Sequence, residues 1–414
     1  MKDEIRAHLN EPGHLEKLYR GNKVPFKREF IALYPELKGN ALADFWNERL
    51  SYETDEINWG TGRELLFVVL AGLVAGFIAK IPGMFPIDEL FFYPRNAGFI
   101  FLPLLTAYFA WKNNLHPKHI AVICAVLLVS LVYINALPDS TKSDTLLLAC
   151  IHLPLLLWVL LGAAFVGNNL TDTDKRLEFL RYNGDLIVMT TLILIAGGIM
   201  TGLTIGLFSL IGFQIEKFYF EYIGVFGLAS APIVGTYLTQ TNPQLVNKVS
   251  PVIAKIFSPL VLIMLVVYLV AIYYSGKDPY NDREFLIIFN LLLIGVMAIV
   301  FFSVAESAKT TGNTTATWVL FLLSAVTILV NGIALSAIVF RISEWGITPN
   351  RLAVLGGNLL MLLNLLFIAF LLFRSLTNKS DIAAVGRSIA TFLPVYSIWA
   401  MVVVFLFPVI FGFK

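Results

Sequence analysis

Long apolar runs separated by short polar segments make up the chain from residue 65 to its end. Eleven runs approach the roughly 20 residues that an α-helix needs to cross a bilayer, and the run at 97–111 is shorter than the others. The pattern predicts an all-α, polytopic transmembrane helix bundle. The expected spans are 65–79, 97–111, 118–137, 145–166, 185–213, 218–239, 251–274, 285–304, 316–340, 351–373 and 389–413.

The first 62 residues follow a different pattern. Apolar side chains recur there at helical spacing among many polar ones, which predicts three short amphipathic helices broken at 21–22 and 35–40. We therefore divide the chain into a small helical N-terminal cap, residues 1–62, and a transmembrane helical domain, residues 63–414.

A cap of this size buries little surface of its own. Its apolar stripe is expected to rest either on the loops of the membrane domain or on a protein partner. In the second case, Phe26, Phe30 and Trp46 should form an exposed apolar patch.

The composition excludes a single water-soluble fold. Hydrophobic residues make up 57% of the chain, charged residues 14%, and the mean hydropathy is +0.77, whereas soluble domains contain about 25% charged residues. Ten of the 30 Lys/Arg and eleven of the 28 Asp/Glu precede residue 64. The net charge of +2 gives no reason to expect nucleic acid as a partner, so the lipid bilayer is the expected environment.

The distribution of Lys and Arg predicts the orientation of the spans. No cleavable signal peptide is expected, and the first apolar run then acts as an uncleaved anchor. With the N-terminus inside, eleven Lys/Arg lie in inside loops and nine in outside segments, and the ten in the N-terminal region favour the same orientation. We expect a cytoplasmic N-terminus and a C-terminus on the other side.

The expected fifth span, 185–213, is unusually long and rich in glycine. As a straight helix it would measure about 43 Å, more than the roughly 30 Å hydrocarbon core, so it must tilt, protrude or break. Gly198, Gly202 and Gly206 form a stripe of small residues. The stripe predicts either close packing against the sixth span or a broken helix whose backbone lines a cavity.

Polar side chains inside the apolar runs are the next candidates, because each one needs a partner or water in hydrocarbon. His152 is either a hydrogen-bonded histidine of the bundle or a proton relay. Glu221 either reaches the interface or faces an internal cavity, where it would couple protons or bind a cation. Four asparagines predict interhelical hydrogen bonds or a hydrated polar path: Asn290, Asn331, Asn358 and Asn364.

Sequence motifs of catalysis are missing, which argues against an enzyme. The chain has no G-x-S-x-G, H-E-x-x-H or P-loop motif. Asp172 and Asp174 are the nearest approach to paired carboxylates, and with Lys175 and Arg176 behind them they indicate a solvated helix start rather than a metal site. His116 and His119 share a loop, but zinc normally takes three or four protein ligands and no third is evident. Cys124 and Cys150 both lie in apolar runs. We therefore expect no cofactor, no metal and no catalytic residues.

The segment 341–351, R-I-S-E-W-G-I-T-P-N-R, lies between the ninth and tenth spans. Gly346 permits a tight reversal, and Thr348 or Asn350 can cap the following helix. Glu344 is the obvious ion-pair partner for Arg341 and Arg351. The three side chains predict a clamp on two helix ends or a site for an anion or lipid headgroup.

This segment resembles the signature R-I-x-E-[YW]-G-[IL]-T-x-N-R of a bacterial polytopic membrane family. That family is catalogued as domain-of-unknown-function family forty-one fifty-three. The stretches 216–232 and 268–274 are also similar to it, and the resemblance covers about residues 180–375. Residues 276–281 depart from the Leu-Pro-x-Gly-Trp pattern of many members. The resemblance implies a multi-pass protein of the bacterial inner membrane and no defined chemistry.

Two functions fit these observations. The first is a transporter or permease-like protein for a small solute or ion, which predicts a polar cavity beside the fifth and sixth spans containing Glu221 or His152. The second is a non-transporting scaffold or sensor that docks a partner through its N-terminal cap. A membrane-embedded enzyme would need a cluster of titratable residues, and the sequence offers only scattered ones.

Overall fold

The structure is a computed structural model that describes residues 2–21, 23–52, 59–139, 143–210, 213–246, 249–275, 280, 283–307, 314–377 and 381–413. The chain divides into two compact units, Met1–Trp59 and Gly60–Lys414. Each unit has its own hydrophobic core.

The N-terminal unit contains four helices: α1 (Lys2–Ala7), α2 (Pro12–Gly21), α3 (Lys23–Leu37) and α4 (Ala41–Tyr52). Helix α1 was not expected, and α3 continues through Pro35 as far as Leu37. At the surface, Arg20 donates to the carboxylate of Glu16, with Arg49 also beside it. These two guanidinium groups hold the pKa of Glu16 below its usual range.

The expectation of an exposed apolar patch on this unit is wrong. Phe26, Phe30 and Trp46 are buried inside the unit, where the rings of Phe26 and Phe30 lie 5.2 and 6.3 Å from that of Trp46. The added helix α1 contributes Ile5 to the same core. Four short helices around one tryptophan therefore bury the stripe that three separate helices would have exposed.

The second unit consists of helices, two π-helical turns (Tyr219–Gly224 and Val402–Leu406) and a 3-10 turn (Pro243–Leu245) in the residues described. The helices are α5 (Gly62–Met84), α6 (Glu89–Lys112), α7 (Pro117–Ala136), α8 (Asp144–Val166), α9 (Thr173–Leu210), α10 (Glu216–Phe218), α11 (Val225–Thr241), α12 (Val249–Ser275), α13 (Arg283–Ser307), α14 (Thr314–Trp345), α15 (Pro349–Leu376), α16 (Ile382–Met401) and α17 (Phe407–Ile410).

Ten candidate spans among the described residues are long and apolar enough to cross a membrane. This confirms an all-α polytopic helix bundle and an integral membrane protein. Helix α6, which contains the expected span 97–111, is not among the ten, because Arg95 and Asn96 lower its hydropathy. Both side chains are buried: Arg95 donates to the carbonyl oxygens of Ile134 and Leu137, and Asn96 exchanges hydrogen bonds with Asn135.

Two groups of helices form two separate cores in this unit. The first core takes its buried side chains mainly from α5, α6, α7, α8 and α11, and the second from α12, α13, α14, α15 and α16. The first half of α9 contributes to both: Phe179 and Tyr182 belong to the first core, Leu177 and Leu180 to the second. Two residues along a helix correspond to a rotation of about 200°, so residues two apart lie on nearly opposite faces. Helix α9 therefore packs a different face against each group.

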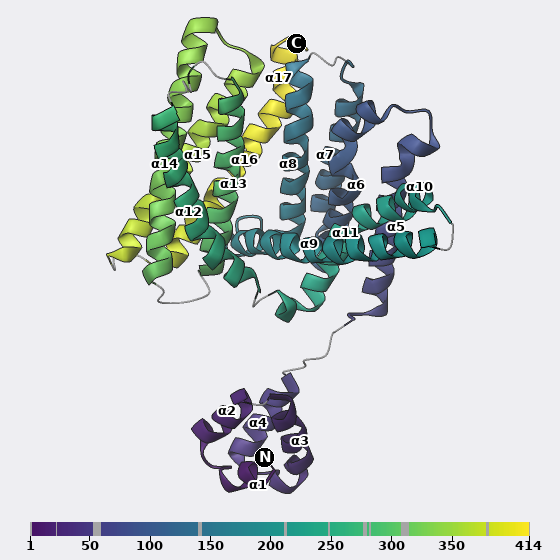
Figure 1. Ribbon diagram of the computed structural model, residues 1–414, viewed down its shortest axis with the longest axis vertical. Coiled ribbons are helices and arrows are strands. Elements are labelled where there is room, and N and C mark those ends of the chain that lie inside the picture. Colours follow the sequence, from purple (N-terminus) through teal and green to yellow (C-terminus); the bar gives the residue numbers. More distant parts are fainter. Residues whose placement is uncertain are drawn as a thin grey trace. The chain divides into compact units, whose positions relative to one another are not determined.

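Helix α9 is an unbroken helix of 38 residues. Figure 1 shows that it runs crosswise to the upright helices and lies below α7 and α8 in this view. Length and hydropathy make it a candidate span, but its second half, beyond Thr190, is almost entirely exposed. The expected fifth span neither breaks in the described residues nor runs parallel to the other spans.

Close helix packing through glycine occurs, but not at the stripe on α9. Gly198, Gly202 and Gly206 have no neighbouring atom within 4 Å of an added Cβ position. On α5, in contrast, an added Cβ at Gly76 would lie 2.1 Å from the ring of Phe226. Phe226 lies on α11, about one turn before Ser230. The stripe on α9 thus packs against no helix among the described residues, since spacing alone does not identify a neighbour.

The N-terminal unit provides a direct test of its core. We expect segment 1–59 expressed alone to unfold cooperatively by far-UV circular dichroism. Trp46→Ala should remove about 3–5 kcal/mol and abolish the transition, because Trp46 is 2% exposed. The neighbouring Phe45→Ala is the control, since Phe45 is 59% exposed and its loss should change stability by about 0.5 kcal/mol or less. Equal effects of the two substitutions would contradict this core.

The glycine contacts give a second prediction, measured as thermal unfolding of the full protein in detergent. Gly76→Ala forces Phe226 to move and should destabilise the α5–α11 contact by about 1–3 kcal/mol. Gly202→Ala meets open space and should leave stability unchanged or raise it by up to about 1 kcal/mol through helix propensity. A destabilising Gly202→Ala would show that the second half of α9 is tightly packed.

Candidate functional site

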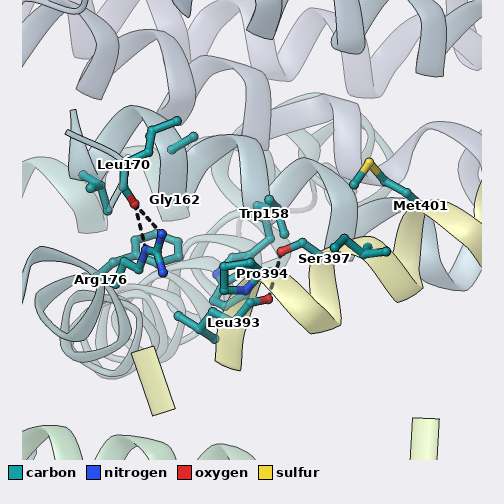
Figure 2. A pocket seen from close by; sticks show the side chains of 13 residues that line it. Trp158, Gly162, Leu170, Arg176, Leu393, Pro394, Ser397 and Met401 are labelled. Carbon is teal, nitrogen blue, oxygen red and sulfur yellow. Dashed lines mark hydrogen bonds between the residues drawn. The ribbon is translucent and has the colours of Figure 1, made fainter. Parts of the chain in front are cut away.

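A cavity of about 340 Å³ lies between α8, α9 and α16 (Figure 2). Its size falls in the range of small-molecule sites, about 300–1,000 Å³. Almost all of its lining is apolar, and Arg176 is its charged residue. The lining consists of Trp158, Val159, Gly162, Ala163 and Val166 from α8, Leu170, Arg176 and Phe179 from α9 and its approach, and Leu393, Pro394, Ser397, Ile398 and Met401 from α16.

The guanidinium of Arg176 is held in place by backbone carbonyls. Its Nε donates to the carbonyl oxygen of Leu170 at 2.9 Å, and its Nη1 donates to that of Ala390 at 3.1 Å (the Leu170 bond is drawn in Figure 2). Ala390 lies four residues before Pro394 on α16, and proline has no N–H to occupy that carbonyl. The proline that lines the cavity therefore also frees the acceptor that anchors the arginine.

No carboxylate among the described residues forms an ion pair with Arg176, although Asp172 and Asp174 lie nearby in sequence. Asp172 instead accepts backbone N–H groups at the start of α9. An arginine offers five N–H donors, and carbonyl oxygens take three of them here. The remaining donors and the uncompensated charge can bind an anionic group, while the aromatic and aliphatic walls bind an apolar body.

Trp158 and Ser397 add little polarity to this cavity. Trp158 donates its indole N–H to Asn183 on α9 at 2.8 Å, and Ser397 donates to the carbonyl oxygen of Leu393 in its own helix at 3.0 Å. With both groups already bonded, Arg176 remains the polar group of the lining that is best placed to orient a bound molecule.

Three of the four predicted asparagines come together in the second helix group. Asn358 on α15 donates its amide to the side-chain oxygen of Asn290 on α13 at 2.8 Å, and Asn331 on α14 donates to the backbone carbonyl of Asn358 at 3.1 Å. These are the interhelical hydrogen bonds that the sequence predicted. The Oδ1 atom of Asn331, fully buried, has no hydrogen-bond partner in the part of the chain that the structure describes.

Asn364 lies apart from that cluster. It donates to the hydroxyl of Tyr396 on α16 at 3.1 Å and so links α15 to α16. On α14, the buried side chains of Thr317, Ser324 and Thr327 continue the polar face that contains Asn331. Ser324 and Thr327 donate to carbonyl oxygens one turn earlier in their own helix. The hydroxyl groups are thus satisfied locally, and the asparagines make the contacts between helices.

Glu221 and His152 do not line the cavity. The side chain of Glu221 is 45% exposed, with the ammonium groups of Lys80 and Lys217 at 4.0 and 3.9 Å. Glu221 lies in the π-helical turn that precedes α11, so straight helical periodicity misplaces its side chain. His152 is bonded through Nδ1 to the carbonyl oxygen of Leu148 in its own helix at 2.9 Å. Neither residue therefore contributes to the cavity described here.

The loop between α14 and α15 has the expected backbone but not the expected ion pairs. Thr348 caps α15 by accepting from the N–H of Arg351, and Gly346 adopts a φ of 75°. Arg351 donates to the carbonyl oxygens of Trp345 and Gly346 at 2.9 and 2.7 Å. Glu344 is exposed and pairs with neither arginine.

The guanidinium groups of Arg341 and Arg351 lie 5.7 and 5.6 Å from the ring of Trp345. Arg341, which is buried, also donates to the carbonyl oxygen of Tyr280. The arginines thus hold this loop through carbonyl oxygens and an aromatic ring. Residues 276–279, where the sequence departs from the family pattern, lie outside the described residues.

Sequence reasoning missed Arg176 as a site residue and Arg181 as a structural one. Arg181 on α9 forms an ion pair with Glu306 on α13 at 3.2 Å and donates to the carbonyl oxygen of Ala305 at 2.8 Å. The available signal was the pair of basic residues at 176 and 181, which enter an apolar helix. The spacing of these arginines does not identify the distant carbonyl oxygens and the carboxylate with which their guanidinium groups interact.

Comparisons with known proteins add no identification. A scan against protein-family models finds no match, and searches of the curated proteins and of the solved structures find none either.

Proposed function

We propose that the protein is a permease-like carrier of a small solute, and that the solute is an amphiphile with an apolar body and an anionic group. The observation that supports this is the largely apolar cavity between α8, α9 and α16, whose arginine pairs with no carboxylate in the described part of the chain. Burying the apolar part of such a solute contributes about 25 cal/mol per Å².

The anionic group would meet Arg176 at the edge of the cavity. Its guanidinium is already fixed by Leu170 and Ala390, so little side-chain freedom would be lost on binding. Hydrogen bonds to a charged group are worth about 1.5–3 kcal/mol. Charge and apolar surface together would select an anionic amphiphile over an inorganic anion or a neutral hydrocarbon.

We also propose the membrane in which the protein lies and its orientation there. We place it in a bacterial inner membrane with its N-terminal unit in the cytoplasm, on the asymmetry of Lys and Arg and on the resemblance of segment 341–351 to the family of unknown function. No observation favours a partner-docking scaffold, since the aromatic residues expected to dock are buried in the N-terminal unit.

Uptake by proteoliposomes tests the proposal, with radiolabelled octyl phosphate as the probe. Wild-type protein should give saturable uptake above that of empty liposomes. Arg176→Gln should reduce uptake about tenfold or more, because a charge-assisted hydrogen bond to the anionic group is lost. Arg176→Lys keeps the charge and should retain part of the activity.

Arg387→Gln is the matched control, since Arg387 is an exposed arginine on α16 outside the cavity lining. It should transport like the wild type. Thermal unfolding of each variant shows whether it is folded. Wild-type uptake no greater than that of empty liposomes would refute transport of this class. Retention of an anionic membrane lipid in this cavity without octyl phosphate uptake would identify a lipid-binding site instead of a carrier.

A further inference from the structure

Three side chains of metal-ligating type meet at the junction of α1 and α2 in the N-terminal unit. His8 follows the end of α1, Glu11 precedes α2, and His14 lies in its first turn. The backbone fixes their spacing, because the N–H of Glu11 donates to the carbonyl oxygen of His8 at 3.0 Å and the N–H of His14 to that of Glu11 at 3.1 Å. Residues three apart along such turns place their side chains on one face.

The ligating atoms of these residues are close enough for one ion. One such atom from each of His8, Glu11 and His14 lies within 4.8 Å of the other two. Nδ1 of His8 is 3.1 Å from a carboxylate oxygen of Glu11, and the imidazole rings of His8 and His14 stack with their centroids 3.8 Å apart. Because the rings are nearly parallel, one imidazole must rotate out of the stack before both rings and the carboxylate can form bonds of about 2.0–2.2 Å to one ion.

His14 provides a further observation. Its Nε2 atom is shielded from solvent and has no hydrogen-bond partner in the described residues. Buried polar atoms in folded proteins nearly always have a partner, and one without any calls for an explanation. Coordination of an ion through Nε2 would give this nitrogen a partner.

We infer that His8, Glu11 and His14 form a binding site for a divalent transition metal of the zinc class. Two imidazoles and one carboxylate suit zinc, whereas calcium and magnesium take oxygen ligands. Three protein ligands leave a fourth position for water or another ligand. The ion would join the end of α1 to the first turn of α2, and so stabilise the N-terminal unit by an amount that grows with the logarithm of the zinc concentration above the dissociation constant. This site is independent of the proposed carrier function.

Zinc binding to the full-length protein tests this site. The protein in detergent is stripped with a chelator, titrated with zinc chloride by calorimetry, and analysed for bound metal by mass spectrometry after removal of free zinc. We expect the wild type to retain about one zinc ion per chain. The His8→Ala/His14→Ala double variant should retain none.

The chain offers a matched control in its other histidine pair, His116 and His119, whose rings lie 6.3 Å apart. The His116→Ala/His119→Ala double variant should bind zinc like the wild type. Glu11→Gln serves as a second probe: its side chain is 62% exposed, so the substitution removes a ligand without disturbing the core, and it should weaken binding about tenfold or more. Zinc retention by the His8/His14 variant, or no zinc on the wild type, would overturn the inference.

Discussion

The ion pair between Arg181 and Glu306 is the interaction on which the membrane unit depends. The two side chains are 16% and 5% exposed, and they join α9 to α13. Moving charges out of water is costly unless they are paired and further hydrogen-bonded, and the carbonyl oxygen of Ala305 supplies an additional acceptor for the guanidinium. The ion pair and the hydrogen bond to Ala305 together hold the first half of α9 against α13.

The course of α9 determines where the candidate site forms. Leu177 packs against α16, where an added Cβ at Gly386 would lie 2.6 Å from it, and Phe179 packs against α8 in the same way at Gly162. Arg176 lies just before these contacts and completes the cavity between the same three helices. The cavity therefore forms because one helix packs against both cores. The guanidinium of Arg176 is held by two backbone carbonyl oxygens, one in the loop before α9 and one that Pro394 leaves without its helical N–H donor.

The sequence was sufficient for features that depend on local physics. Hydrophobic run length predicted the helical bundle, and turn chemistry predicted a cap at Thr348 or Asn350 and a reversal at Gly346; the structure confirms the bundle and the reversal and places the cap at Thr348. Features that depend on which face of a helix meets a neighbour were not predictable. The direction of Glu221, the crosswise course of α9 and the carbonyl partners of Arg176 all follow from contacts between segments distant in sequence. For the asparagines, the sequence predicted that each side chain would need hydrogen-bond partners within the bundle, but it did not identify the partner residues.

A double-mutant cycle on Arg181 and Glu306, read as thermal unfolding of the full protein in detergent, tests this account most directly. Arg181→Met or Glu306→Gln alone removes this buried ion pair while leaving the other residue in place, and should cost about 3–5 kcal/mol. The double variant removes both charges and should be more stable than either single variant. A double variant whose loss equals the sum of the two single losses would contradict the account, because it would show that the two residues contribute independently.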